Sequence, residues 1–259
     1  MRTWAEFHRV VKRPGSELLW RLDEFDDSIL VAGCQRSGTT ALTHAIGDTA
    51  GAAHYAFGRD SELDGALLLA GCVARFTEGR HCFQTTYLND RFAEYLFHES
   101  FRLIWVLREP RSVVYSMLHN WRRGALNRLY DSCGTTRLDA VHHETSMLDR
   151  WMGPSRLDKA CASYVGKTEQ VFLLRRELKA RMLVVDYDEL VGRPNDTLRH
   201  ICDFADTPFD PRLADHLHQR SSGRGDRLAP WQAARVDDAC LAVYRAALTL
   251  RHRRRLSSV

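Results

Sequence analysis

Residues 29–42 read Ile-Leu-Val-Ala-Gly-Cys-Gln-Arg-Ser-Gly-Thr-Thr-Ala-Leu, an apolar run that leads into a glycine-bounded loop and then into a helical pattern. A continuous apolar run of this length predicts a strand that is buried on both faces of a parallel sheet. The loop from Gly33 to Gly38 and the start of the next helix predict a cradle of backbone N–H groups for a phosphate or sulfate group. This stretch therefore predicts an α/β protein with an anion site at the end of its first strand.

The same loop lacks the lysine of ATP- and GTP-binding loops. Those loops read G-x-x-x-x-G-K-[ST], and their lysine reaches the β and γ phosphates. Here Thr39 follows Gly38 directly, and the cation of the loop is Arg36. Because no lysine can bridge a β/γ pair, the loop favours a donor with one 5′-phosphate and one transferable charged group over a triphosphate.

The rest of the chain alternates strand and helix patterns. We expect strands at 82–86, 101–107 and 181–185, and helices at 38–48, 63–70, 110–121, 155–178, 195–204 and 231–251. This alternation predicts a mostly parallel central sheet with helices on both faces. Ligands of such sheets bind beyond the carboxyl ends of the strands, where Arg36, Arg108 and Tyr187 are expected. His81, just before the second predicted strand, is expected at the surface.

Composition narrows the class of protein. The chain has 259 residues, of which 44% are hydrophobic and 27% charged, as in an ordinary globular protein. We expect a single domain over 1–259, with an N-terminal extension at 1–27 and a lid or acceptor-binding segment at 122–154. A net charge of +4 does not favour a nucleic-acid partner. The seven cysteines are scattered, which favours reduced thiols, and no apolar run could span a membrane, so we expect a cytoplasmic protein.

Two further motifs indicate which class of protein the chain resembles. Arg108-Glu-Pro-Arg-Ser-Val-Val-Tyr-Ser116 places an arginine at a strand end and a hydroxyl in the following helix, and these two groups can hold one phosphate from two sides. The third motif is Val184-Val-Asp-Tyr-Asp-Glu-Leu-Val-Gly-Arg-Pro194. With the loop, these motifs resemble the 5′-phosphosulfate loop, the 3′-phosphate motif and the Tyr-Glu-Asp-Leu segment of sulfotransferases that use 3′-phosphoadenosine-5′-phosphosulfate (PAPS). The resemblance covers about residues 29–209 and implies their P-loop-like α/β fold.

The resemblance implies a role for each matching residue. Arg36 would contact the 5′-phosphate and the sulfuryl oxygens, Arg108 and Ser116 would hold the 3′-phosphate, and Tyr187 would lie against the adenine. A fixed arginine and helix-terminus amides would stabilise the charge that develops as the S–O bond breaks. The loop at 220–228 would add a further 3′-phosphate contact from Arg224 or Arg227. The expected donor site, which needs no metal, comprises Gln35, Arg36, Ser37, Gly38, Thr39, Thr40, Arg108, Ser116, Tyr187 and Arg224.

The residues available as a general base differ from those found in one branch of that family. Members that act on small phenols and steroids carry Lys-Thr-His, whereas this chain reads Phe83-Gln-Thr-Thr86. Other branches, which act on carbohydrate or protein tyrosine, use a carboxylate shortly after the loop helix, and the chain is more similar to them. The candidates are Glu62 and Asp60, with His54 third. Asp60 is also suited to cap the helix that follows it.

Three functions fit these patterns. The first is transfer of the PAPS sulfuryl group to a hydroxyl or amine of a small-molecule or carbohydrate acceptor. The second is a small-molecule kinase with a degenerate loop, for which Asp186 is the one candidate Mg²⁺ ligand after a strand. The third is a non-catalytic nucleotide-binding protein that has lost its base. The sequence indicates neither the acceptor nor the oligomeric state.

Overall fold

The central feature of the fold is a four-stranded parallel sheet with the strand order β2-β1-β3-β4. This computed structural model describes residues 1–49, 60–74, 79–137, 153–217 and 223–251. Strand β1 pairs with both β2 and β3, so that Val31 lies between Gln84 and Ile104. The strands are β1 (Ser28–Gly33), β2 (Cys82–Gln84), β3 (Phe101–Leu107) and β4 (Met182–Asp186). The predicted parallel α/β sheet is confirmed.

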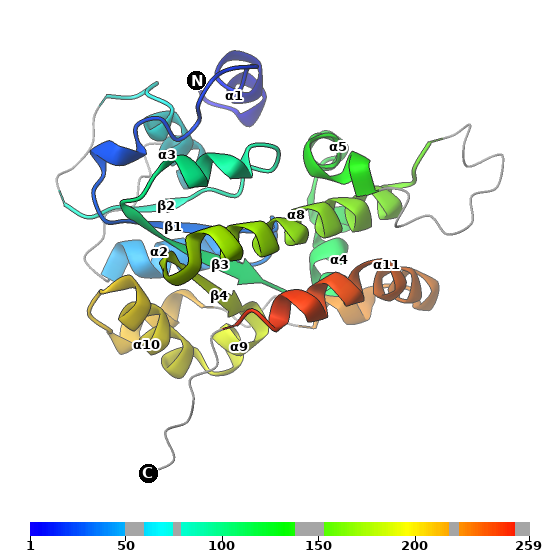
Figure 1. Cartoon of the computed structure of the whole chain (residues 1–259). Coiled ribbons are helices and arrows are strands. Elements are labelled where there is room, and N and C mark those ends of the chain that lie inside the picture. Colours follow the sequence, from blue (N-terminus) through cyan, green and yellow to red (C-terminus); the bar gives the residue numbers. More distant parts are fainter. Residues whose placement is uncertain (50–59, 75–78, 138–152, 218–222, 252–259) are drawn as a thin grey trace, which may run out of the picture.

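Helices cover both faces of this sheet (Figure 1). Pro110 begins α4, where its fixed φ suits the first turn and its missing N–H costs nothing. The helices are α1 (Trp4–Val10), α2 (Thr39–Thr49), α3 (Ser61–Leu69), α4 (Pro110–Asn120), α5 (Arg123–Leu129), α8 (Arg156–Leu178), α9 (Tyr187–Gly192), α10 (Pro194–Ala205) and α11 (Pro230–Leu248). Short 3₁₀ or π turns lie at 22–24, 92–97, 130–134, 135–137, 179–181, 211–216 and 224–227.

Alternate residues of each strand enter two separate cores. On one face, Leu30, Leu103 and Trp105 pack with α3, α8 and the N-terminal segment that contains α1. On the other face, Val31 and Ile104 pack with α2, α9 and α10. Because both faces are covered, the strands are mostly apolar rather than alternating, and their polar residues, such as Ser28, Arg102 and Asp186, lie at or near the strand ends.

A third core lies where α4, α5, α8 and α11 meet. Figure 1 shows α8 crossing the sheet and continuing past it, with α4 and α11 beside its far end. Residues such as Val113, Met117 and Cys161 have no exposed surface there. This bundle holds the segment after β3, which carries Arg108 and Ser116, against the rest of the molecule.

Some expectations change at this level. His81 is 2% exposed, because its ring stacks on Phe83 and meets the edge of Phe25, so its predicted surface position is wrong. Of the 122–154 segment, residues 138–152 lie outside the described part of the chain, and its role as a lid stays a prediction. Within the described residues, no helix is both long and apolar enough to traverse a bilayer.

Candidate active site

One cavity of about 670 Å³ opens at the carboxyl ends of the strands. Its walls come from the loop after β1, the end of β2, the residues that follow β3 and β4, and α1, α3 and α5. All the residues predicted from the sequence for donor binding line it, with the exception of Ser37, and so do both carboxylate candidates for the base. The predicted residues that line the cavity are Gln35, Arg36, Gly38, Thr39, Thr40, Asp60, Glu62, Arg108, Ser116, Tyr187 and Arg224.

The loop between β1 and α2 is tightly turned. Arg36 has a φ of +76°, which is uncommon for a residue other than glycine and typical of functional loops. The Ser37 N–H donates to Cys34 O at 3.1 Å and the Ser37 side chain is fully buried, so Ser37 supports the turn rather than the cavity wall. The contact of Ser37 with the donor stays a prediction. Helix α2 starts at Thr39, with its N-terminus at the cavity.

Gly38 is required by the packing of the loop against α9. Its φ is +93°, and a Cβ at this position would lie 2.2 Å from the Tyr187 ring. Tyr187 itself is 3% exposed and begins α9 directly after β4. Tyr187 of the segment 184–194 therefore packs against Gly38 of the loop after β1.

Arg36 and Arg108 lie close together. Arg108 donates from Nη1 to Arg36 O at 3.0 Å, and Arg36 Nε donates to Ser116 Oγ at 2.9 Å. The Arg108 guanidinium also lies 4.3 Å from the centre of the Tyr187 ring, a cation–π distance. Arg36 and Ser116, which the resemblance assigns to the 5′-phosphosulfate and to the 3′-phosphate, are thus in direct contact with each other.

Arg224 is the third cation of this site. It begins the turn at 224–227, which rests on α4 because Gly225 N donates to Ser112 Oγ at 3.3 Å. Burial lowers the pKa of Arg36 and of Arg108, and the charge of Arg224 lowers both further. Arg224 lines the cavity, whereas Arg227 does not. Arg128 of α5 is a fourth arginine on its wall, and together these guanidinium groups raise the positive potential there.

Glu62, which belongs to α3, also lines the cavity. Its Oε2 accepts a hydrogen bond from Gln84 Nε2 at 2.9 Å, and its Oε1 accepts one from the Thr86 hydroxyl. Burial raises the pKa of Glu62 to about 7, although the Thr86 hydrogen bond opposes the shift. Gln84 Nε2 also donates to Thr39 Oγ1 at 3.1 Å, so the carboxylate is connected to the start of α2. A carboxylate with this pKa is suited to exchange protons near neutral pH.

Asp60 has a structural task in addition to its place on the cavity wall. Its Oδ1 accepts from Leu63 N at 3.1 Å, which caps α3, and its Oδ2 accepts from Trp4 Nε1 at 2.6 Å. Both oxygens are thus engaged in holding α1 and α3 together. The role of either carboxylate as base stays a prediction, and His54 lies outside the described residues.

The family model for the sulfotransferase domain matches residues 73–228, more than half of the chain. The chain belongs to the sulfotransferase family. The matched region begins at residue 73, after the loop and Glu62. The positions of Arg36 and Glu62 in the cavity are therefore observations that do not depend on that match.

Solved structures show the same fold. Mouse sulfotransferase SULT7A1, complexed with PAP, is 15% identical over 91% of this chain and 92% of that chain, with a TM-score of 0.51. The sulfotransferase domain of the Synechococcus PCC 7002 olefin synthase is also 15% identical, over 87% of this chain and 94% of that chain, with a TM-score of 0.50. No curated protein matches the sequence.

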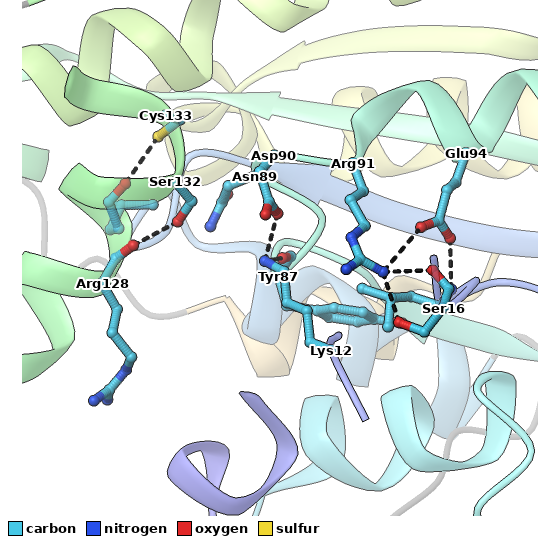
Figure 2. A network of polar contacts seen from close by, with 12 residues as sticks. Lys12, Ser16, Tyr87, Asn89, Asp90, Arg91, Glu94, Arg128, Ser132 and Cys133 are labelled. Carbon is cyan, nitrogen blue, oxygen red and sulfur yellow. Dashed lines mark hydrogen bonds and ion pairs between the residues drawn. The ribbon is translucent and has the colours of Figure 1, made fainter. Parts of the chain in front are cut away.

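Sequence reasoning missed the contribution of α1 to this sulfotransferase site. Trp4 and His8 line the cavity, although the sequence assigned 1–27 only to an extension. Their spacing places Trp4, Phe7 and His8 on one helix face, which is the signal that could have indicated a packed helix. Lys12, just after α1, bonds Tyr87 O at 3.4 Å and pairs with Asp90 at 2.5 Å (Figure 2). These contacts join the N-terminal segment to the loop after β2.

Proposed function

We propose that this sulfotransferase moves the sulfuryl group of PAPS to a hydroxyl or amine of a small-molecule or carbohydrate acceptor. One observation carries the proposal: Arg36, Arg108 and Arg224, together with the N-terminus of α2, line the same cavity as the carboxylate of Glu62. The cations suit a donor with several negative groups, and the carboxylate suits an acceptor that must lose a proton.

The donor residues divide by position. Arg36, Thr39, Thr40 and the α2 N-terminus would hold the 5′-phosphosulfate, because helix N-termini and arginine both favour oxyanions. Arg108, with Ser116 and Arg224, would hold the 3′-phosphate. The Tyr187 ring would lie near the adenine. The mouse neighbour of the same fold is complexed with PAP, the abbreviation for adenosine 3′,5′-bisphosphate, which is what PAPS becomes after it loses its sulfuryl group. That complex is consistent with such a donor.

The proposed reaction is a single in-line displacement. Glu62 accepts the proton of the acceptor hydroxyl, whose oxygen then forms a bond to sulfur. The bond between sulfur and the 5′-phosphate oxygen breaks, and its electron pair stays on the phosphate of the departing PAP. Arg36 stabilises the charge that develops there without needing to reorganise. Gln84 and Thr86 hold the Glu62 oxygens in place by the hydrogen bonds described above.

The two other functions have less support. The kinase needs Asp186 at the cavity, but Asp186 Oδ1 accepts from Asp188 N at 3.1 Å and its Oδ2 pairs with Arg251 at 3.3 Å, and it does not line the cavity. The non-catalytic protein would have lost its base, yet Glu62 lies in the cavity with a pKa of about 7.

Two measurements test the proposal. Calorimetry should show tight binding of PAP without magnesium and no gain from ATP with magnesium, whereas the opposite preference would support the kinase. Incubation with ³⁵S-labelled PAPS and pools of phenols, alcohols, amines and sugars should then give a labelled product. Tight PAP binding with no transfer to any pool would favour the non-catalytic protein.

A further inference from the structure

A buried lysine stands directly behind the carboxylate of the active site. Lys167 lies in the middle of α8 and has no exposed surface. Its Nζ donates to Thr86 O at 3.2 Å and lies 5.3 Å from the centre of the Trp105 ring. A lysine is almost never buried completely unless it is paired, because the charged form loses its hydration. The reason for its burial must therefore lie in its surroundings.

Thr86 connects this lysine to Glu62. The carbonyl oxygen of Thr86 accepts from Lys167 Nζ and, at 2.9 Å, from Gln35 Nε2 of the donor loop. The hydroxyl of the same residue donates to Glu62 Oε1. Thr86 thus has its carbonyl oxygen bonded by the buried Lys167 and its hydroxyl directed at the Glu62 carboxylate. A change at Lys167 would reach Glu62 through a single residue.

The electrical surroundings make Glu62 the main partner of this charge. Besides burial, the ionisable groups that act on the pKa of Lys167 are, in decreasing order, Cys133 in the turn after α5, Cys34 after β1, Glu62 on α3, and Lys12. Burial raises the pKa values of both thiols far above neutral, so they carry no charge at pH 7. The charge of Lys12 is offset by Asp90. The ionised form of Glu62 is thus the negative charge among these groups that can act on Lys167 near neutral pH.

Neighbouring charged groups also act on the pKa of Glu62. Asp60 raises its pKa and Lys167 lowers it, while burial remains the largest influence. The nearby phenols of Tyr87 and Tyr95 have pKa values raised by burial and are neutral. Burial lowers the pKa of Lys167 to about 8, which leaves most of it protonated at pH 7. The lysine and the carboxylate therefore each favour the charged form of the other.

We propose that Lys167 is a positioning residue: it holds the Thr86 peptide, directs the Thr86 hydroxyl at Glu62, and supplies the buried positive charge that favours the ionised carboxylate. The importance of this for catalysis rests on the proposed function, in which Glu62 is the base. The charge coupling between the two residues does not depend on it.

The test measures the titration of Glu62 directly. Protein labelled with ¹³C at the glutamate δ-carboxyl is titrated by NMR, and the Glu62 signal is assigned by its loss in Glu62→Gln. Lys167→Met, which keeps the length of the side chain, should raise the pKa of Glu62 by about 1 unit or more. If sulfotransfer is measurable, the acid limb of its pH profile should move upward by the same amount.

Lys12→Met is the matched control. Lys12 also bonds a peptide oxygen of the loop after β2, that of Tyr87, but its charge is paired with Asp90 (Figure 2). This variant should leave the Glu62 titration unchanged. A folded Lys167→Met protein with an unshifted Glu62 titration would overturn the proposal, as would an equal shift in the Lys12 control.

A second variant reads the same coupling from the other side. Glu62→Gln should lower the pKa of Lys167, followed through its ¹³Cε signal, because coupling between two titrations is reciprocal. This arm decides the matter if Lys167→Met does not fold, and an unchanged Lys167 titration would then refute the coupling. Failure of PAP to bind in calorimetry would remove the proposed function but leave these shifts in place, so the two failures are distinguishable.

Discussion

Replacement of Arg108 by methionine should separate binding of the 3′-phosphate from binding of the rest of the donor. Arg108 is 4% exposed, lines the cavity, and is positioned by Arg36 O and the Tyr187 ring. We expect Arg108→Met to weaken PAP strongly and adenosine 5′-phosphate only slightly. The difference arises because the second nucleotide lacks the group that Arg108 is proposed to hold.

The size of the effect follows from the contacts. A hydrogen bond to a charged group contributes about 1.5–3 kcal/mol, so a guanidinium that holds a phosphate through two of them contributes about 3–5 kcal/mol. At about 1.4 kcal/mol for each tenfold step, PAP affinity should fall roughly 100- to 4,000-fold. The hydrogen bond from Arg108 Nη1 to Arg36 O is also lost, at about 1 kcal/mol, and this affects both nucleotides by about fivefold.

Calorimetry with the two nucleotides, on the parent protein and the variant, measures both losses. Arg111→Met is the control, because Arg111 lies on α4 near Arg108 but pairs with Asp237 and does not line the cavity. It should change neither affinity by more than about twofold, since exposed ion pairs contribute less than about 1 kcal/mol. Equal losses for PAP and adenosine 5′-phosphate in Arg108→Met would refute the assignment of the 3′-phosphate to this residue.

Two further substitutions test the carboxylate and the loop. Glu62→Gln should lower sulfotransfer by about 10²- to 10⁴-fold while PAP affinity stays nearly constant. In the parent protein the rate should rise with pH through about 7, because burial raises the pKa of Glu62 to about 7 and only the ionised form accepts a proton. Full activity of the Glu62→Gln variant would exclude Glu62 as the base. Gly38→Ala should abolish PAP binding, since its Cβ would meet the Tyr187 ring, whereas Gly15→Ala, with φ +79° and open space around it, should only reduce thermal stability. Similar PAP affinities in these two glycine variants would show that the contact with Tyr187 does not matter for the loop.

Local sequence pattern was enough to predict which residues gather at one end of the sheet. The loop after β1, Arg108 at the end of β3 and Tyr187 after β4 all follow buried apolar runs, and parallel strands bring their carboxyl ends to one edge. The sheet and these three positions could therefore be predicted without any knowledge of packing. The contact between Arg36 and Ser116 could not, because side-chain direction depends on how α4 lies against the loop.

The sequence by itself determined the parallel α/β fold and the place of the candidate site at the carboxyl ends of the strands, because hydrophobic period and loop chemistry are short-range properties of the chain. Only the tertiary structure distinguished the surroundings of Glu62 from those of Asp60, since it shows Asp60 bonded to Trp4 of α1 and to Leu63 of α3, whereas Glu62 accepts hydrogen bonds from Gln84 and Thr86. Only the tertiary structure placed Lys167, far along the chain, behind that carboxylate. The pKa of a buried group depends on desolvation and on charges brought close by folding, and neither can be read from neighbours in the sequence.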